Sequence, residues 1–408
     1  KYSGWYSVRD EAYYDESETR LDEAGQRVGP MGTPVEWVEE ESYFFWLSRY
    51  AEPLLAHIQR HPEFVQPEAR RNEVVAFIRQ GLRDLSVSRT SFRWGIPVPF
   101  DPGHVIYVWI DALTNYISAI GYGDDPEKFH RYWPADVHLV GREIVRFHAV
   151  IWPILLHAAG IAVPRQTFAH GWLTFGGQRF SKSLGIVIDP RALSEEVARE
   201  SGAEVGVAVD ALRYFLLREI PFGQDGDFNK PALVHRFNAD LANDYGNLLH
   251  RTLALVQRHF QGLIPERGAD EGGDAALRET VVASAGAVEG YIDRLDFRGG
   301  LEAIWQILGA ANKYLDEEAP WRHLRQGRAR RAGAILYNTL EAVRIASVLL
   351  SPWLVTASAR AWEQLGVPQD LAMQRLPQAV RWGGLPPGVR VRPGGPIFPR
   401  IERPAVVP

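Results

Sequence analysis

The spacing of hydrophobic and polar residues changes several times along the 408-residue chain. Residues 1–36 alternate aromatic and polar side chains and end in Gly and Pro, which predicts short strands and a turn. From Trp37 to about Leu85 apolar residues recur at helical spacing, so we predict helices, with the aromatic run at residues 43–47 in their core. The chain therefore opens with a small β-module followed by helices.

Residues 86–168 read as alternating strands and helices. The apolar run at residues 105–110 predicts a buried strand that feeds a helix ending near Ile120. A second strand is predicted at residues 136–141, and Gly141 opens a helix that continues to about Leu155. Two successive strand–helix units predict parallel pairing, with ligands bound beyond the carboxyl ends of the strands. This rule points to residues 109–112 and 141–143.

Residues 168–190 form two short apolar segments around a Gly176-Gly177 turn, then a polar loop before a strand-like segment at residues 186–188. The loop gathers cations and hydroxyls, namely Arg179, Ser181, Lys182 and Ser183. Such groups suit phosphate oxygens, because a lysine follows charge as it shifts and serine hydroxyls add donors. A solvated turn is the alternative, and the loop by itself does not decide between them.

The second half of the chain is helical. Residues 192–219 predict a helix with a break near Ser201-Gly202, and from Phe228 the helical pattern continues for well over a hundred residues. Further helices are predicted at residues 275–293, 298–317 and 332–350, which together form an α-helical bundle. From about Leu385 the chain is rich in Pro and Gly, so we predict a segment that runs over the surface.

Composition narrows the function classes. The length allows two or three domains, and the absence of cysteine excludes disulfides, cysteine nucleophiles and thiolate metal sites. The absence of cysteine also makes a reducing compartment the natural setting. There is neither a signal-peptide pattern nor a run of about 18 apolar residues, so we expect no membrane association and a cytoplasmic location. The chain begins at Lys1 inside what reads as folded sequence, so we expect that the beginning of the gene product is missing.

The net charge of −5 conceals a gradient along the chain. Residues 1–41 carry four basic residues against eleven Asp and Glu, whereas residues 322–331 contain five arginines. We therefore expect any nucleic acid to meet the later part of the chain through local patches rather than through overall charge.

Two features of the bundle suit RNA. At about 100° per residue, Asn243, Asn247 and Arg251 fall on one helix side opposite the apolar stripe. Amides and a guanidinium hydrogen-bond or stack on unpaired bases, although a plain solvated face has the same pattern. Pro320-Trp321 stands just before the arginine-rich run, where Trp321 either anchors a helix start or offers a plane for a base.

The α/β part offers an apolar pocket. Trp109, Ala112, Tyr116, Ile144 and His148 are spaced to close one with a few polar tips. It suits a flexible apolar side chain, and aromatic rings favour a thioether sulfur, although periodic aromatics also form plain cores. The spacing of the other histidines in this region matches no metal-ligand pattern, so we predict no metal site there.

The combination of these motifs resembles the methionyl-tRNA synthetases, a family of class I aminoacyl-tRNA synthetases, from Lys1 to about Glu402. Residues 179–183 (RFSKS) stand where that family has Lys-Met-Ser-Lys-Ser, and residues 107–112 (YVWIDA) resemble its amino-acid-pocket strand. Residues 141–148 (GREIVRFH) resemble the segment that holds the adenosine ribose. The positions that this family uses to read the CAU anticodon are matched by Asn243, Asn247, Arg251, Pro320 and Trp321.

The resemblance implies a fold and an activity. The fold would be the C-terminal half of a class I Rossmann-type catalytic α/β domain followed by an all-α helical-bundle anticodon-binding domain. The activity would be ligation of L-methionine to tRNA-Met through methionyl-adenylate, with ATP as its Mg²⁺ complex and no protein-bound zinc. We expect domains at residues 1–88, the rest of a zinc-free connective insertion with its following helices; 89–168, the second half of the catalytic domain; 169–226, the signature-loop region; 227–384, the bundle; and 385–408, an extended segment.

The resemblance also implies roles for residues. Lys182 would neutralise the ATP phosphates, with Arg179, Ser181 and Ser183 on the same loop. Gly141 and Glu143 would contact the ribose. The methionine side chain would be surrounded by Trp109, Ala112, Leu113, Tyr116, Ile144 and His148.

Several departures from the family pattern bear on these expectations. Arg179 and Phe180 replace the first Lys and the Met of the signature, and Leu113 stands where a proline is common. No His-x-Gly-His stretch occurs in the 408 residues, so we expect a fragment that catalyses adenylation far more slowly than an intact synthetase. The alternatives are a non-catalytic tRNA-binding module and a class I synthetase for another apolar amino acid.

Overall fold

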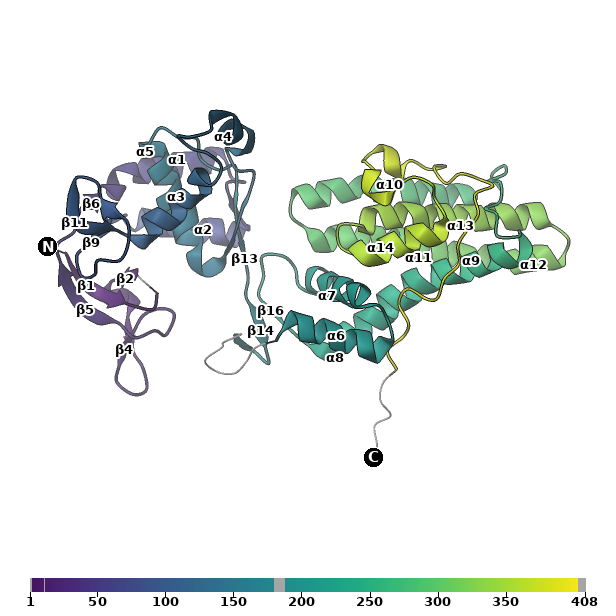
Figure 1. Ribbon diagram of the computed structural model, residues 1–408, viewed down its shortest axis with the longest axis horizontal. Helices are drawn as coiled ribbons and strands as arrows, with labels where there is room; N and C mark the ends of the chain where they lie inside the picture. The colour runs from purple at the N-terminus through teal and green to yellow at the C-terminus, as the bar shows by residue number, and fades with distance from the viewer. Residues whose placement is uncertain (1, 11, 180–187, 403–408) are drawn as a thin grey trace. The chain divides into compact units, whose positions relative to one another are not determined.

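The computed structural model describes residues 2–10, 12–179 and 188–402, and the chain divides into two compact units. The N-terminal unit comprises Lys1–Gly171 and the C-terminal unit Trp172–Pro408 (Figure 1). Each unit has its own hydrophobic core and is described separately.

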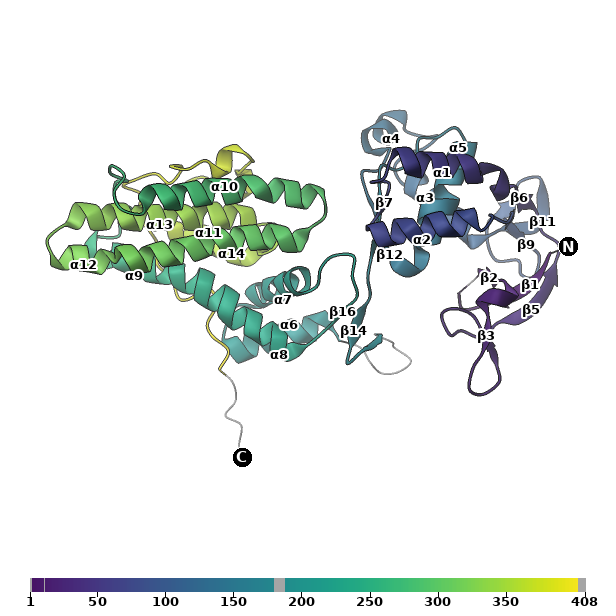
Figure 2. The same cartoon turned by 180° about the vertical axis from the view of Figure 1, so that it is seen from behind.

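The N-terminal unit opens with a β-module, as its alternating pattern predicts. Its antiparallel sheet has the order β2-β1-β5, and a small hairpin of β3 and β4 extends from it (Figure 2). The strands are β1 (Tyr2–Ser7), β2 (Ala12–Tyr14), β3 (Arg20–Leu21), β4 (Arg27–Val28) and β5 (Glu36–Glu40).

The aromatic run at residues 43–47 departs from the prediction. Phe44–Phe45 forms strand β6, which pairs with β8 (Leu85–Ser86), and helix begins only at η2 (Leu47–Tyr50) and α1 (Ala51–Arg60). The expectation that this run is core is wrong for Tyr43, Phe44 and Trp46, which are exposed. Strand pairing with a short partner leaves one face of the run open, and the Arg49 guanidinium covers the Trp46 ring at 3.4 Å.

The apolar run at residues 105–110 is also divided differently from the prediction. Strand β11 (Asp101–Ile106) ends within it and pairs antiparallel with β10 (Pro97–Val98) and β9 (Ser88–Arg89). Helix α3 (Val108–Ser118) starts immediately afterwards, so the expected buried parallel strand is wrong. A short apolar run has no periodicity that separates strand from helix, and the pairing partners decided the boundary here.

The second predicted strand–helix unit is confirmed. Strand β12 (His138–Gly141) pairs in parallel with β13 (Thr167–His170), which pairs in parallel with β7 (Val65–Gln66). After β12 the chain continues as a helical stretch interrupted by a π-helix. The remaining helices of the described part of this unit are η1 (Glu16–Glu18), α2 (Glu68–Arg79), α4 (Pro126–Tyr132), η3 (Arg142–Ile144), the π-helix η4 (Phe147–Ile151) and α5 (Trp152–Ala158).

The C-terminal unit begins with the predicted hairpin. Strands β14 (Leu173–Phe175) and β15 (Gln178–Arg179) flank Gly176 and Gly177, whose φ angles of 58° and 76° favour glycine at both positions. Strand β14 also pairs in parallel with β16 (Gly226–Asp227). The predicted helical break is confirmed, because α6 (Pro190–Ser201) ends at Gly202 with φ of 74° before α7 (Val205–Glu219).

The predicted bundle is confirmed. A continuous helical stretch of α8, the π-helix η6 and α9 leads into it, and α13 lies at its centre (Figures 1 and 2). Its helices are α8 (Lys230–Arg236), η6 (Phe237–Asn247), α9 (Leu248–His259), α10 (Asp274–Asp293), α11 (Phe297–Glu318), α12 (Pro320–Arg325), α13 (Ala329–Leu350) and α14 (Val355–Leu365). Among the described helices, α13 is long and apolar enough to cross a membrane, but its apolar stretch is wholly buried within the protein, as in a core helix.

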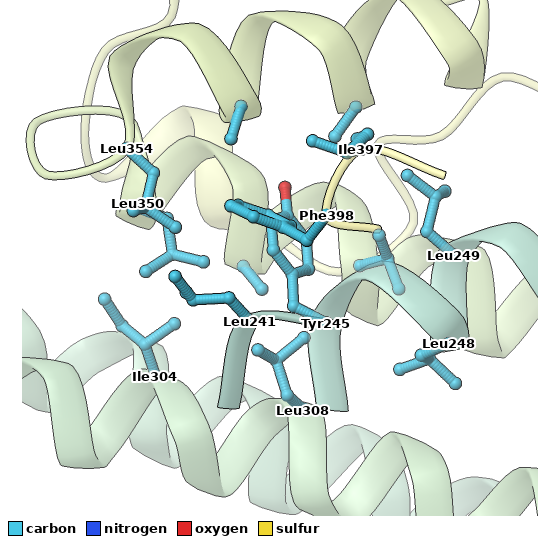
Figure 3. Packing of buried hydrophobic residues seen from close by; sticks show 14 of the residues in the cluster. Leu241, Tyr245, Leu248, Leu249, Ile304, Leu308, Leu350, Leu354, Ile397 and Phe398 are labelled. Atoms are coloured by element: carbon cyan, nitrogen blue, oxygen red, sulfur yellow. The ribbon is translucent and has the colours of Figure 1, made fainter. Parts of the chain in front are cut away.

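The C-terminal segment, residues 385–402, differs from the surface loop that its Pro and Gly content predicts. Its backbone is irregular, but Leu385, Phe398 and Ile401 are buried in the bundle core. Figure 3 shows Ile397 and Phe398 beside Leu241 and Tyr245. Apolar side chains scattered between prolines and glycines anchor this strap, because burying each one is favourable whatever the backbone conformation.

Candidate active site and RNA-binding surface

Helix α3 carries three of the predicted pocket residues on one side. Trp109, Ala112 and Tyr116 follow the i, i+3, i+7 spacing that aligns side chains along a helix. The Trp109 ring stacks on Phe147 of the π-helix η4, with ring centroids 3.8 Å apart and planes 11° apart. Phe147 was not among the predicted pocket residues, although its place beside His148 in the sequence was a usable signal.

Tyr116 and His148 are joined by a hydrogen bond. The Tyr116 Oη atom lies 2.8 Å from His148 Nε2, and His148 Nδ1 lies 3.0 Å from the Ile144 carbonyl oxygen. A carbonyl only accepts, so Nδ1 carries the proton and Nε2 accepts from the tyrosine hydroxyl. The hydrogen bonds therefore select one neutral tautomer of His148.

The electrostatics of this pair favour an uncharged pocket. Burial lowers the pKa of His148 and raises the pKa of Tyr116, so both side chains are neutral near pH 7. Aromatic rings with two satisfied polar tips suit an apolar ligand group better than a charged one.

The remaining predicted pocket residues lie in different surroundings. Leu113 is fully buried in a small core with Ile117 and Trp152, which Trp109 covers. Ile144 is half-buried and packs against the larger core of the unit, and Ala112 is exposed. The structure thus brings Trp109, Tyr116 and His148 into direct ring contact, whereas Leu113 lies beneath them.

A neighbouring cavity of about 330 Å³ was not predicted. It shares Tyr116 with the pocket, and its lining includes Tyr132, Trp133 and His138. His138 is buried with its ring 4.3 Å from Tyr116, and burial, aided by His148, lowers its pKa to about 4. Within the described part of the chain its Nε2 atom has no hydrogen-bond partner. The adjacent aromatic pair Tyr132-Trp133 was the available sequence signal.

Gly141 and Glu143 lie at the carboxyl end of parallel strand β12. A Cβ atom at Gly141 would lie 2.5 Å from a carboxylate oxygen of Glu143, so this carboxylate folds back over the glycine. Any larger residue would displace it. The carboxylate is therefore placed at the edge of the sheet where parallel sheets bind ligands.

The predicted phosphate loop is described only in part. Lys182, Ser181, Ser183 and Phe180 lie outside the described residues, and Arg179 ends strand β15 opposite Thr174. The hairpin that leads into the loop is held by Asp227, which accepts hydrogen bonds from the Thr174 hydroxyl (2.7 Å) and the Gly177 N–H (2.9 Å). Hydrogen bonding to Gly177 is the main reason that the pKa of Asp227 is lowered. Asp227 was not predicted, because it is distant from the loop in sequence.

The polar helix face of the bundle is present. Asn243 and Asn247 are exposed, whereas Phe237, Leu241 and Tyr245 are fully buried. Residues 237–247 form a π-helix, so the spacing of about 100° per residue expected for an α-helix does not apply there. The polar and apolar side chains nevertheless lie on separate faces. The Asn243 amide donates to the Asp244 carboxylate at 3.1 Å.

Arg251 is less free than its sequence pattern indicates. It is half-buried, and its Nη1 atom lies 2.9 Å from the Asp316 carboxylate near the end of α11. Asp316 was not predicted, because this ion pair joins residues on separate helices. The ion pair links the α9 face to the end of α11, next to helix α12 (Figure 1).

Pro320 and Trp321 open helix α12 at the end of the bundle, next to α9 in both views (Figures 1 and 2). Ala319 turns the chain from α11 into α12 with a left-handed φ of 42°, a conformation that costs free energy for a non-glycine residue. Trp321 is half-buried and packs against the bundle core. Trp321 therefore anchors the start of α12, and part of its ring surface remains exposed to solvent.

No group of three or more His, Asp or Glu side chains within the described ranges is arranged to hold a metal ion. His138 and His148 have ring centroids 6.1 Å apart, and His157 and His170 are exposed elsewhere in the N-terminal unit.

Comparison with known proteins adds two family matches. The family described as "tRNA synthetases class I (M)" matches residues 2–253, and the "Anticodon binding domain of methionyl tRNA ligase" matches residues 264–405. Among curated relatives, the methionine–tRNA ligase of Caldanaerobacter subterraneus is 46% identical over 98% of this chain and 61% of its own length. That of Thermotoga maritima is 44% identical over 98% of this chain and 62% of its own length. The chain thus spans about three fifths of these relatives.

Solved structures agree with the family matches. The methionyl-tRNA synthetase of Mycobacterium tuberculosis in complex with methionyl-adenylate is 47% identical with a TM-score of 0.90, covering 98% of this chain and 76% of that chain. The apo form of the same enzyme is 45% identical with a TM-score of 0.88, covering 99% and 77%.

Proposed function

The chain belongs to the class I methionyl-tRNA synthetases, and we propose that it takes part in the ATP-dependent ligation of L-methionine to tRNA-Met. The observation that carries this proposal is the neutral aromatic pocket that Trp109 and Tyr116 of α3 form with His148 of the π-helix after β12. The same chain carries a bundle with an amide-bearing face, which suits recognition of an RNA loop.

In the first half-reaction a methionine carboxylate oxygen attacks the α-phosphorus of ATP, supplied as its Mg²⁺ complex. The bond from the α-phosphorus to the bridging oxygen breaks, so pyrophosphate leaves and methionyl-adenylate forms. Lys182 would neutralise the charge that develops on the phosphates, aided by Arg179, Ser181 and Ser183. Catalysis of this kind consists of positioning and charge stabilisation.

The pocket would position the amino acid. Trp109, Tyr116 and His148 present ring surfaces to the thioether, and the hydroxyl of Tyr116 is already satisfied by His148. Ile144 and Ala112 would complete the wall, with Leu113 supporting it from the core. Glu143, folded over Gly141, would accept hydrogen bonds from the ribose hydroxyls of the adenosine.

In the second half-reaction a terminal ribose hydroxyl of tRNA attacks the methionyl carbonyl, and AMP leaves. Asn243, Asn247, Arg251, Pro320 and Trp321 would read the CAU anticodon. We propose a cytoplasmic location.

Binding of tRNA-Met and of tRNAs with altered anticodons to the purified 408-residue chain tests the RNA part of this proposal. Asn247→Ala and Trp321→Ala should each weaken binding to the CAU anticodon by about 1–3 kcal/mol. Thr280→Ala, a change of an exposed polar residue on α10, is the control and should leave binding unchanged. Equal affinity for every anticodon would refute the reading of CAU.

Methionine-dependent ATP–pyrophosphate exchange separates an enzyme from a non-catalytic tRNA-binding module, which is the second candidate. Any exchange that disappears in Lys182→Ala supports the catalytic role of the loop. The expectation that the 408-residue chain exchanges far more slowly than an intact synthetase stays a prediction that the same assay measures.

A further inference from the structure

The end of the bundle carries a cluster of exposed arginines that the proposed function does not use. It lies where α12 leads into α13, directly after Trp321. The exposed arginine cluster consists of Arg322, Arg325, Arg328 and Arg330. The next arginine in the sequence, Arg331, is buried and belongs to a different network.

The neighbouring carboxylates are already engaged by other cations. Asp316 pairs with Arg251 at 2.9 Å, and Glu317 lies 3.8 Å from Lys313. Glu318 pairs with the buried Arg331 at 2.6 Å. None of the four clustered arginines forms an ion pair with a carboxylate in the described part of the chain, so their charge is uncompensated.

Two of these arginines occupy a position that is unfavourable for folding. Arg328 is the N-cap of the 22-residue helix α13, and Arg330 lies in its first turn. The N-terminus of a helix carries partial positive charge, so cations there destabilise the folded protein unless an anion offsets them. A residue that breaks a local rule without compensation within the fold is expected to serve a function.

The pKa of His323, which lies between Arg322 and Arg325 in the sequence, also indicates excess positive charge at this corner. Burial is the main reason that the pKa of His323 is lowered, and the positive charges of Arg328 and Arg331 lower it further. The corner is therefore electropositive, as a site for an anion requires.

The position of the cluster next to the candidate RNA-binding face indicates that the anion is an RNA phosphate. Helix α12 is six residues long, about 9 Å, and carries Arg322 and Arg325 together with Trp321. Helix α13, with Arg328 as its N-cap, begins shortly after α12 ends. The Arg251–Asp316 pair connects the same corner to the face that carries Asn243 and Asn247. An RNA whose bases met that face would bring its sugar–phosphate backbone to this corner.

We propose that the exposed arginine cluster binds backbone phosphates of the RNA that the bundle recognises, an inference that rests on the proposed function. Guanidinium forks match phosphate oxygens in a bidentate manner, and such contacts orient the RNA without reading sequence. The cluster therefore supplies affinity and register, whereas Asn247 and Trp321 supply specificity.

The test is the salt dependence of tRNA binding by the full 408-residue chain. Arg328→Gln/Arg330→Gln removes two charges, and the slope of log K against log salt should become less negative by about 1.4 to 1.8. Affinity at low salt should fall by the same factor for a CAU anticodon and for an altered one.

The matched control is Arg381→Gln/Arg392→Gln, which changes the same net charge at two exposed arginines after α14. It should leave the slope unchanged. Thermal unfolding is measured in parallel, and the cluster variant should be as stable as the parent or more so, because it removes cations from a helix N-terminus. An unchanged slope, an equal change in the control, or a loss of binding that only follows loss of stability would each overturn the proposal.

Failure of the proposed function looks different. If Asn247→Ala and Trp321→Ala leave anticodon discrimination unchanged while the cluster variant reduces the slope, the phosphate contacts stand and anticodon reading fails. If discrimination falls in those variants while the slope is unaffected by the cluster variant, the reverse holds.

Discussion

Among single residues, the hydrogen bond between Tyr116 and His148 fixes the protonation of the pocket, because His148 Nε2 accepts from the tyrosine hydroxyl. Tyr116→Phe removes the donor and leaves His148 Nε2 buried without a partner. An unsatisfied buried acceptor costs about 1–3 kcal/mol, so the free energy of unfolding should fall by that amount. Urea denaturation measures it, with Tyr122→Phe, an exposed tyrosine of the same unit, as the control. No difference between the two variants would contradict the assigned tautomer.

His138 predicts a pH dependence of stability. Its pKa of about 4 in the folded protein lies below the value of about 6.5 in an unfolded chain, so the unfolded state binds more protons between these values. The stabilising contribution is present above pH 6.5 and is lost as pH falls toward 4, by roughly 3 kcal/mol in total. Unfolding measured between these pH values should depend less steeply on pH in His138→Gln, and His157→Gln, at an exposed histidine, should retain the slope.

Among the structural elements, the strap formed by residues 385–402 packs against the buried side of the π-helix η6. The Phe398 ring packs against the Phe237 ring. It also packs against the ring of Tyr245, which lies beside it in Figure 3. The buried Glu341 carboxylate accepts hydrogen bonds from the backbone N–H groups of Gly383 and Gly384, just before the strap, and of Leu385, its first residue. The strap is thus part of the bundle core.

Phe398→Ala should therefore lower the free energy of unfolding by about 3–5 kcal/mol, the usual cost of a buried phenylalanine. Chemical denaturation followed by helical circular dichroism measures the change. Phe398→Leu, which keeps much of the volume, should recover most of the loss. A cost below about 1 kcal/mol would show that the strap is dispensable for stability.

The corner between α11 and α13 is held by a buried ion-pair network. Arg331 donates to both carboxylate oxygens of Asp274, at 2.7 and 3.0 Å, and Tyr314 donates to the same carboxylate. Burial alone would raise the pKa of Asp274, but these hydrogen bonds outweigh it and the pKa is lowered. Arg331→Met leaves Asp274 buried and uncompensated, so unfolding free energy should fall by about 3–5 kcal/mol. Asp274→Asn/Arg331→Met should recover part of it, and a loss that simply adds would contradict direct pairing.

At the scale of the whole molecule, the chain divides into two units, and the stability changes predicted above fall in different units. His138 lies in the N-terminal unit and Phe398 in the C-terminal unit. Each unit has its own core, so each should unfold as its own cooperative body. Hydrogen exchange should show that lowering the pH from 6.5 to 4, the range in which His138 acts, deprotects the N-terminal unit, whereas Phe398→Ala deprotects the C-terminal unit. Equal deprotection of both units by either change would mean that they unfold together.

Long periodic patterns were enough to predict most of the bundle, because a helix that buries one face over three or more turns must repeat its apolar residues. Helices α10, α11 and α13 lie within a few residues of their predicted ranges. The turn at Gly176-Gly177 and the helix break at Gly202 were also predicted correctly, because positive φ angles favour glycine. The motifs that resemble the family were also readable in order, and the family is confirmed.

Short apolar runs did not carry that information. Residues 43–47 and 105–110 have no period that separates strand from helix, and pairing with β8, β9 and β10 decided their structure. Likewise, the Pro- and Gly-rich content of residues 385–402 indicated an irregular backbone, but only packing against the helices of the bundle placed Leu385, Phe398 and Ile401 in the core.

The sequence by itself determined the family, the helical bundle and the residue types at each candidate site. Only the tertiary structure decided the neutral tautomer of His148, the engagement of Arg251 by Asp316 and the exposure of the arginine cluster beside a buried Arg331. The physical reason is that charge and hydrogen bonding depend on partners from separate elements, and distance along the chain does not reveal these partners.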